Sequence, residues 1–391
     1  MLLLYSSSKF FDYHRPNSDN QSITLDQFVI IVYNQGRIVQ NLDIKAMKIK
    51  VGVLGATGYT GAELLRLLVS HPGVEISWLT SEKFAGKRIS EVFPQFRNLL
   101  DLECVKVARL DGLHEVNLVF SCLPHGASMH FVAKLLQTGA RVIDFSADFR
   151  LNHPDTYERW YKVKHSSNNL LKEAVYGLPE IFRKEIRDAK LVANPGCYAT
   201  SAIMGLAPLF SKGMIKENSV VVDSKSGLSG GGRAPSLEHH FSESNETASI
   251  YGVSGHNQRP EMEQELSRLA GKPVNITFIP HSIAINRGML TTIYARLKEA
   301  KSYDQIFDLY SQYYGGQQFV RIYEKGQFPS VKNVRFSNFC DIGIGFQDDV
   351  FISVVALDNL GKGASGQAVQ DMNIMFDFPE DEGLKYPGIY P

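Results

Sequence analysis

A glycine-rich loop between two apolar runs restricts the fold of this chain more than any other feature. Residues 48–54 are mostly apolar and precede the loop Gly55-Ala56-Thr57-Gly58-Tyr59-Thr60-Gly61, and residues 62–70 carry leucines at helical spacing. A second apolar run follows at residues 74–79. This order predicts a strand, a loop, a helix and a second strand, the unit in which glycines let a pyrophosphate approach a helix N-terminus. The spacing is GxxGxxG rather than GxGxxG, so a tight turn without a ligand is the alternative.

The residues after the second run bear on which dinucleotide would bind. Thr80 and Ser81 end the run, and Glu82 is followed by three cations, Lys83, Lys87 and Arg88. A carboxylate at this place binds the ribose 2′-OH of NAD, whereas hydroxyls and cations suit the 2′-phosphate of NADP. The pattern favours NADP, with Glu82 as a ribose ligand, or a solvated charge cluster, as the alternatives.

Two further strands are predicted at residues 117–123 and 141–145, and each runs into a polar loop. In an open parallel sheet, ligands bind at the carboxyl ends of the strands. We therefore expect the first loop, with Ser121 and Pro124, at the nicotinamide end of a dinucleotide. The second loop ends in Arg150, which would meet a phosphate or carboxylate; a structural ion pair with Asp144 or Asp148 is the alternative.

Cys197 follows the turn Asn194-Pro195-Gly196 and precedes a stretch with one apolar face at residues 198–207. Residues 191–193 read as the end of a strand, so the cysteine is predicted at a helix N-terminus. Unpaired backbone N–H groups there favour an anion and lower the pKa of a thiol from about 8.5. Cys197 is thus the candidate nucleophile, and a buried structural cysteine is the alternative.

The second half predicts strands at residues 220–223, 274–279, 289–297 and 350–357, with the spacing of an antiparallel or mixed sheet. Glycine-rich loops separate them. Residues 226–233 are expected to form a nest of N–H groups for an anion, with Arg233 adding charge, or else a flexible loop. His256 is the candidate acid and base because its usual pKa is near neutrality, and His281 is its competitor.

Composition narrows the class of protein. The 391 residues suffice for two domains, and the balance of 41 Lys+Arg against 41 Asp+Glu gives no general field for nucleic acid or anionic membrane. The four cysteines contain no CxxC pair, which argues against a zinc knuckle or a disulfide scaffold and suits the cytoplasm. No apolar run is long enough to span a bilayer. No metal site is expected.

Residues 1–46 differ from the rest. Met1-Leu2-Leu3-Leu4-Tyr5 is too short for a signal-peptide core, and the acidic residues of this segment weaken a transit-peptide interpretation. Residues 25–33 are compatible with a short strand. We expect a dispensable extension or a mis-assigned start at Met1, since Met47 stands just before the first predicted strand.

Together these motifs resemble those of the N-acetyl-gamma-glutamyl-phosphate reductase family of arginine biosynthesis, in the same order, from about Met47 to the C-terminus. The motifs are the loop at residues 55–61, Ser146 to Arg150, Asn194 to Tyr198, residues 226–233, the His256 loop with Pro260-Glu261, Arg287-Gly288-Met289, residues 337–341 and residues 361–368. One departure is Gln258, where many members carry a second histidine.

The resemblance implies an α/β fold: a Rossmann dinucleotide-binding domain and an α+β catalytic domain of the glyceraldehyde-phosphate dehydrogenase type. It implies an NADP-binding domain of residues 47–195 with 363–391, including a C-terminal helix at residues 365–376. Residues 196–362 would form the catalytic and dimerisation domain of a homodimer or homotetramer.

The same resemblance implies site roles. Cys197 would be the nucleophile, forming a thioester with an acyl phosphate, and His256 the acid and base. Arg287 would bind a substrate carboxylate, with Arg150, Ser229 and Gly230 as further substrate contacts. The expected NADP contacts are Gly55, Thr57, Gly58, Tyr59, Thr60, Gly61, Ser81, Lys83, Ser121, Pro124, Asn338, Gly366 and Gln367.

Two other functions remain open from the sequence. Reductases of aspartyl phosphate or of a carrier-bound aminoadipyl phosphate share the nucleophile loop. A non-catalytic NADP-binding regulator would keep the fold but would be expected to lack Cys197 or His256.

Overall fold

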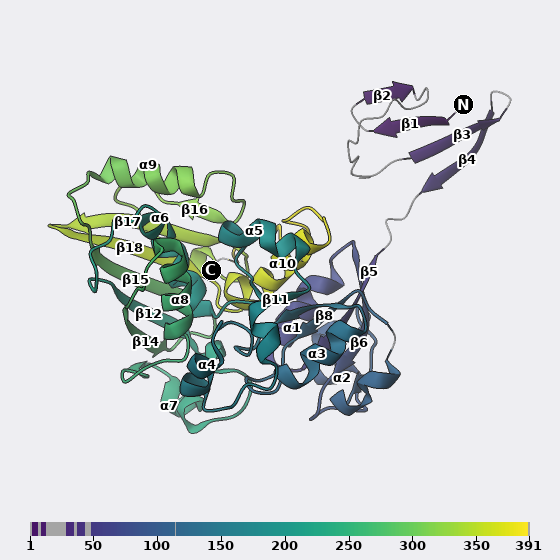
Figure 1. The fold of residues 1–391 in the computed structure, drawn as a ribbon. Coiled ribbons are helices and arrows are strands. Elements are labelled where there is room, and N and C mark those ends of the chain that lie inside the picture. Colours follow the sequence, from purple (N-terminus) through teal and green to yellow (C-terminus); the bar gives the residue numbers. More distant parts are fainter. Residues whose placement is uncertain are drawn as a thin grey trace. The chain divides into compact units, whose positions relative to one another are not determined.

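The computed structural model describes residues 2–6, 9–12, 29–34, 37–43, 48–113 and 115–389. The chain divides into two compact units, Met1–Lys48 and Ile49–Pro391. Each unit is described by itself, and Figure 1 shows the elements of both.

The first unit contains an antiparallel four-stranded sheet in the order β2-β1-β3-β4. Its strands are β1 (Leu2–Ser6), β2 (Lys9–Asp12), β3 (Val29–Asn34) and β4 (Arg37–Asp43). The strand expected at residues 25–33 overlaps β3, and residues 25–28 lie outside the described residues.

The second unit begins with a parallel seven-stranded sheet in the order β10-β11-β9-β8-β5-β6-β7. Its strands are β5 (Ile49–Leu54), β6 (Val74–Thr80), β7 (Cys104–Val105), β8 (Leu118–Ser121), β9 (Arg141–Asp144), β10 (Val175–Tyr176) and β11 (Leu191–Ala193). The five strands predicted in this half are confirmed, and β7 and β10 are short edge strands that no pattern indicated.

Helices connect these strands, as parallel neighbours require. They are α1 (Tyr59–Val69), α2 (Ile89–Val92), α3 (Met129–Gln137), α4 (Pro154–Tyr161) and α5 (Pro179–Asp188). Helix α1 starts at Tyr59, three residues before the predicted start. Gly61 lies in its first turn, where a Cβ atom would stand 2.6 Å from the carbonyl oxygen of Ala56. Glycine at position 61 therefore lets the helix pack closely on the end of β5.

The second sheet is mixed and has the order β13-β14-β12-β15-β18-β17-β16. Its strands are β12 (Val221–Gly227), β13 (Ala248–Ile250), β14 (Thr277–Ile283), β15 (Met289–Arg296), β16 (Val320–Ile322), β17 (Cys340–Gln347) and β18 (Val350–Leu357). The prediction of a mixed sheet is confirmed. The strand expected to begin at Val274 begins instead at Thr277.

One face of this sheet packs on helices. The helices of this half are α6 (Cys197–Ser211), α7 (Phe241–Ser244), α8 (Arg259–Ala270) and α9 (Tyr303–Tyr313). Gly205 of α6 contacts Ile293 of β15 and Val355 of β18. A π-helical turn at Gly361–Ser365 then leads into α10 (Gly366–Met375), which packs on α1 and α5 beside the parallel sheet (Figure 1).

Within the described residues, no helix has the length and apolarity needed to cross a membrane.

Candidate active site

Cys197 is the first residue of α6, directly after β11 and its turn. Several partners hold the turn. The backbone N–H of Asn194 donates to the backbone carbonyl oxygen of Asp144 (2.8 Å), and the backbone N–H of Gly196 donates to Oε1 of Glu261 (2.7 Å). The predicted placement of Cys197 at a helix N-terminus is confirmed.

Arg150 lies beneath this turn rather than at its surface. Its Nε donates to the Asn194 carbonyl oxygen at 2.8 Å, its Nη2 to the Phe145 carbonyl oxygen at 2.7 Å, and its Nη1 pairs with Glu261 at 3.4 Å. The side chain is buried. The geometry therefore favours the alternative of a structural ion pair over the expected substrate contact, with Glu261 as the partner in place of Asp144 or Asp148. Burial takes the guanidinium away from ligands but leaves its charge close to Cys197.

Burial raises the pKa of the Cys197 thiol to about 11, although Arg150, the Tyr198 N–H and the Gln258 amide lower it. The expectation of a lowered pKa is thus wrong for this state of the protein. The free-energy cost of removing the thiolate from water exceeds the stabilisation that these three contacts provide. The thiol needs a further positive charge or a direct proton acceptor to react as a thiolate.

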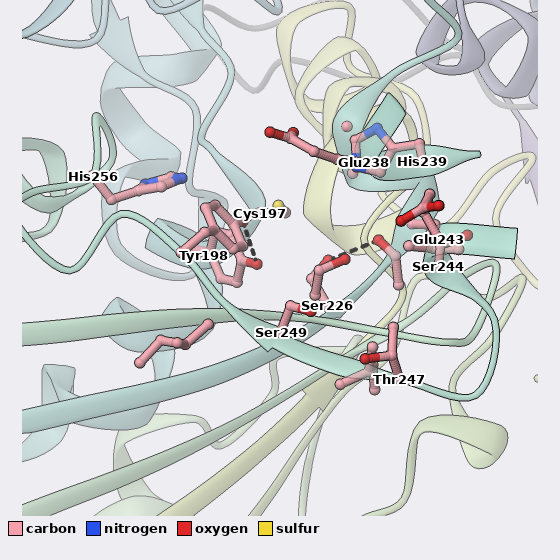
Figure 2. Close-up of a pocket in the computed structure, with 18 of the residues that line it drawn as sticks. Cys197, Tyr198, Ser226, Glu238, His239, Glu243, Ser244, Thr247, Ser249 and His256 are labelled. Carbon is pink, nitrogen blue, oxygen red and sulfur yellow. Dashed lines mark hydrogen bonds between the residues drawn. The ribbon is translucent and has the colours of Figure 1, made fainter. Parts of the chain in front are cut away.

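A pocket of about 670 Å³ opens beside Cys197. In Figure 2, Cys197 and Tyr198 lie between His256 on one side and the segment of Glu238, His239 and Glu243 on the other. Lys and Arg do not occur among its described lining residues, which contain histidines, glutamates and hydroxyl groups. The lining comprises Cys197, Tyr198, Ser226, Gly227, Leu228, Gly230, Gly231, Glu238, His239, Glu243, Ser244, Thr247, Ser249, Ile250, Tyr251, His256, Gln258, Ser282 and Ile283.

His256 stands on the wall of this pocket, edge-on to the rings of Tyr198, Tyr251 and Phe278. Burial lowers its pKa to about 4, so the ring is neutral at neutral pH. Its Nδ1 accepts a hydrogen bond from the Gln258 N–H at 3.2 Å. Since Nδ1 is the acceptor, the neutral ring carries its proton on Nε2, which is therefore a donor.

His281, the competing histidine, lies in β14 and does not line the pocket. Its Nδ1 is 3.1 Å from Oδ1 of Asp223. Because only His256 of the two histidines lines the pocket with Cys197, it is favoured over His281 as the acid and base.

The glycine-rich loop at residues 226–233 does not form the expected nest. The N–H groups of Gly227, Leu228 and Ser229 donate to backbone carbonyl oxygens of residues 285–288. Ser229 Oγ also accepts a hydrogen bond from Asn359 (2.9 Å) and does not line the pocket, whereas Gly230 does. Pairing with the neighbouring loop before β15 therefore uses three of the N–H groups that an anion would need.

Arg233, at the end of this loop, reaches the dinucleotide-binding half. Its Nη1 donates to the Thr57 carbonyl oxygen at 2.9 Å, and its guanidinium lies over the rings of Phe84 and Phe93. The two halves of the second unit are thus in contact beside the glycine loop.

Arg287 is the clearest departure from expectation. Its Nε donates to Asp358 at 2.7 Å, and its two terminal nitrogens donate to Glu63 of α1 at 2.9 and 2.6 Å. The side chain is buried, packs over Phe336 and does not line the pocket. With its guanidinium between two carboxylates, Arg287 joins the loop before β15 to α1, and this geometry gives no support to the expected role of a substrate ligand.

The glycine loop and the end of β6 have the features that a phosphorylated dinucleotide needs. Thr57 Oγ1 and Ser81 Oγ are 2.7 Å apart, and a Cβ atom at Gly58 would have no neighbour closer than 3.8 Å. Glu82 accepts a hydrogen bond from the Val107 N–H at 2.9 Å. One oxygen of this carboxylate is thereby engaged by the protein, which weakens the alternative of Glu82 as a ribose ligand.

Three other expected cofactor residues, Ser121, Asn338 and Gln367, have buried polar side chains. Ser121 Oγ is 2.7 Å from Ser128 Oγ, so this hydroxyl is already paired. Asn338 Nδ2 donates to Gln370 at 2.9 Å, while Oδ1 of Asn338 and Oε1 of Gln367 are buried acceptors with no partner among the described residues. A Cβ atom at Gly366 would stand 2.4 Å from Oδ1 of Asn338. These carbonyl oxygens are compatible with a ligand amide, and the other expected contacts have no such signature.

Three residues hold the site in ways that the sequence did not predict, although Gln258 was noted as a departure from the family motif. Glu261 holds the cysteine turn, Gln258 contacts the first turn of α6, and Gly363 lies so close to Cys197 that a Cβ atom would stand 2.8 Å from the cysteine Cβ. Glu261 and Gly363 occur within the motifs quoted for the resemblance, which was the only signal for them.

Comparison with known proteins agrees with this architecture. Residues 50–189 match the semialdehyde dehydrogenase NAD binding domain, and residues 197–359 match the semialdehyde dehydrogenase dimerisation domain. Aspartate semialdehyde dehydrogenase II from Vibrio cholerae superimposes with a TM-score of 0.66 at 16% identity, over 85% of this chain and 99% of that chain. The enzyme from Candida albicans, solved with NADP, gives 0.64 at 17% identity, over 84% and 98%. The fold and the site therefore define the semialdehyde dehydrogenase class.

Sequence relatives are more specific. The N-acetyl-gamma-glutamyl-phosphate reductase of Geobacter metallireducens is 50% identical over 351 residues, covering 88% of this chain and all of the relative. That of Pelotomaculum thermopropionicum is 48% identical over 347 residues, with the same coverage. The chain belongs to the N-acetyl-gamma-glutamyl-phosphate reductase family.

Proposed function

We propose that this protein reduces N-acetyl-gamma-glutamyl phosphate to N-acetylglutamate 5-semialdehyde with NADPH, releasing phosphate, in arginine biosynthesis. The observation that carries the proposal is Cys197 at the start of α6, on the wall of a pocket that it shares with His256. Family membership and the names of the relatives supply the substrate.

Cys197 attacks the acyl carbon of the substrate. A carbon–sulfur bond forms and the carbon–oxygen bond to phosphate breaks, so the product is a thioester on Cys197. The thiol proton leaves with the inorganic phosphate, which is its direct acceptor. This route suits a thiol whose pKa is raised by burial, because no free thiolate has to accumulate. A thioester accepts hydride far better than a carboxylate does, so the covalent step splits one difficult reaction into two easier ones.

His256 serves the second half of the reaction. When NADPH is bound it supplies hydride to the thioester carbon. The Nε2–H of His256 donates a hydrogen bond to the oxyanion of the resulting tetrahedral intermediate. The carbon–sulfur bond then breaks as the aldehyde forms, and the Cys197 thiolate takes up a proton from water. The tautomer fixed by the Gln258 N–H supports this role as a donor.

The loop from Gly55 to Gly61, with Ser81 and Lys83, would hold NADP. Support comes from the Thr57–Ser81 hydroxyl pair, the open space at Gly58 and the engagement of Glu82 by Val107. The partnerless amide oxygens of Asn338 and Gln367 make these two residues candidates for its carboxamide end.

We further propose that residues 47–195 with 363–391 form the NADP-binding domain and residues 196–362 the catalytic domain of a homo-oligomer. The open face of the mixed sheet is the proposed contact between copies. Gly205 of α6 covers Ile293 and Val355. Their neighbours on the opposite face, Tyr294 and Val354, stay at least partly exposed in the single chain. A second sheet would bury them.

The decisive experiment uses Cys197→Ser with two assays. Phosphate-dependent reduction of NADP with N-acetylglutamate semialdehyde should fall below a few per cent of wild type, while the dissociation constant for NADPH should stay within about twofold because the thiol and the glycine loop lie on separate elements. Aspartate semialdehyde, tested beside it, separates the related acyl-phosphate reductases. Substantial residual turnover in Cys197→Ser would remove the covalent mechanism, and a wild-type chain inactive with both aldehydes would favour a regulator.

A further inference from the structure

Gln258 lies in the loop before α8, and its side chain contacts the first turn of α6. Its Oε1 accepts hydrogen bonds from the N–H groups of Tyr198 (3.0 Å) and Ala199 (3.2 Å). These are the second and third residues of the helix, whose N–H groups have no partner inside the helix. A residue at the N-cap usually supplies this acceptor. Here the N-cap is Gly196, which has no side chain, and Gln258 supplies the acceptor from another part of the chain.

The space at Gly196 fits this arrangement. Gly196 has a φ of −72°, which any residue adopts, so the backbone does not demand glycine. A Cβ atom there would stand 2.4 Å from both Cδ and Oε1 of Gln258. Glycine at this position therefore makes room for the Gln258 amide, and the two residues form one unit beside Cys197.

The same residue touches both groups of the proposed chemistry. The Gln258 side chain is one of the groups that lower the pKa of the Cys197 thiol, against the larger effect of burial. Its backbone N–H donates to Nδ1 of His256 at 3.2 Å. Since Oε1 accepts from Tyr198 and Ala199, the two residues that follow Cys197, Nε2 is the atom of the amide that is left to donate to the sulfur.

We propose that Gln258 is a positioning residue that caps the cysteine helix through Oε1 and donates to Sγ of Cys197 through Nε2. The inference rests on the proposed function only in treating Cys197 as the nucleophile. An amide does not titrate, so in this protein the donor to sulfur is present at every pH.

The two contacts of Gln258 can be separated by substitution. Gln258→Glu keeps an acceptor for Tyr198 and Ala199 and adds a favourable charge at a helix N-terminus, but it replaces the Nε2 donor with an oxygen. Gln258→Ala removes both contacts. Gln312→Glu, on the exposed surface of α9, makes the same change of charge far from the sulfur and is the matched control.

The measurement is the reactivity of the Cys197 thiol. Each variant is alkylated with iodoacetamide across a pH series and the Cys197 peptide is quantified by mass spectrometry, with Cys197→Ser as the blank for the other cysteines. In Gln258→Glu we expect the rate at about pH 8 to fall tenfold or more and the thiol pKa to rise by about one unit or more, with the melting temperature retained. Gln258→Ala should lower both the rate and the melting temperature.

A Gln258→Glu variant that reacts like wild type would overturn the proposal, because a residue that only caps the helix tolerates this change. Gln258→His gives a second criterion. A new ionisation in its alkylation profile, absent from wild type, is expected, and a profile identical to wild type would show that residue 258 does not face the sulfur. Alkylation requires no turnover, so these results stand apart from the Cys197→Ser assay of the proposed function.

Discussion

The two terminal nitrogens of Arg287 donate hydrogen bonds to the carboxylate oxygens of Glu63, with N···O distances of 2.9 and 2.6 Å. These bonds link the loop before β15 to helix α1. The Nε of Arg287 donates to Asp358. The three side chains are buried. Buried ion pairs add little net stability compared with apolar residues, but removal of one partner leaves an uncompensated charge. This cluster is therefore a place where a single substitution should have a large effect.

We predict that Arg287→Met lowers the free energy of unfolding by about 3 kcal/mol, because two buried carboxylates lose a cation and Glu63 keeps only Arg66. Urea unfolding followed by circular dichroism measures the loss. Arg296→Met, on the exposed edge of β15, is the matched control and should change little. A small effect of Arg287→Met on stability, combined with a large rise in substrate KM, would return Arg287 to the role of substrate ligand.

The cluster of Arg287, Glu63 and Asp358 also predicts that the stability of the folded chain depends on pH. Burial alone would raise the pKa of Glu63, but hydrogen bonds and charge from Arg287 and Arg66 lower it below its usual 4.5. A carboxyl group whose pKa is lowered by folding stabilises the folded state above its unfolded pKa, and this contribution disappears as the pH falls through the folded pKa. The stability gap between wild type and Glu63→Gln should therefore be full at neutral pH and narrow below about pH 4.5. Glu75→Gln, at an exposed site, controls for loss of a carboxylate, and a gap independent of pH would contradict the prediction.

His256→Asn is expected to lower kcat by about 10²–10³, with a smaller effect on KM, because the shorter asparagine side chain does not reach the place where Nε2–H donates to the oxyanion. Since burial lowers the pKa of His256 to about 4, the ring stays neutral and the wild-type profile should show no limb from this histidine near its usual 6.5. Steady-state rates across pH test both statements. His281→Asn should stay near the wild-type rate, and a larger loss there than in His256→Asn would assign the donor to the other loop.

Cofactor preference follows from the end of β6. We expect a higher kcat/KM with NADPH than with NADH, because Ser81 and Lys83 can meet a 2′-phosphate while Glu82 is bonded to the Val107 N–H. Lys83→Met should weaken binding of 2′,5′-ADP about tenfold and leave that of 5′-AMP nearly unchanged, as measured by calorimetry. Lys212→Met, an exposed change after α6, is the control. Equal efficiency of wild type with NADPH and NADH would contradict the preference.

Deletion of residues 1–46 should leave the melting temperature and the turnover unchanged. The chain divides at Lys48, and the second unit contains both sheets of the proposed enzyme. Differential scanning calorimetry of the full and shortened chains tests this expectation. A large fall in melting temperature would show that the first unit stabilises the second.

Patterns with a strict period predicted most of the strands. Val350–Leu357 was predicted at its observed bounds because every residue in it except Ser353 is apolar. Its neighbour β17 was missed because Gly343 and Gly345 weaken the strand pattern. In the folded chain these glycines make room for Phe328, whose ring would lie 3.0 and 3.2 Å from a Cβ atom at the two positions. The two glycines, which weaken the strand pattern in the sequence, are therefore explained by their packing against Phe328 in the folded chain.

Local chemistry likewise determined the two ends of the site. The turn before Cys197 and the glycine loop before α1 follow from proline, glycine and apolar spacing over a few residues, so the sequence alone placed both correctly. Whether the long charged side chains bind a ligand or form internal ion pairs was decided only by the tertiary structure. Arg150 and Arg287 satisfy their guanidinium groups with Glu261 and with Glu63, partners more than a hundred residues away, and burial with those carboxylates withdrew them from the pocket. The protonation of Cys197 depends in the same way on the distant residues that exclude water from its thiol, since desolvation outweighs the helix end on which it stands.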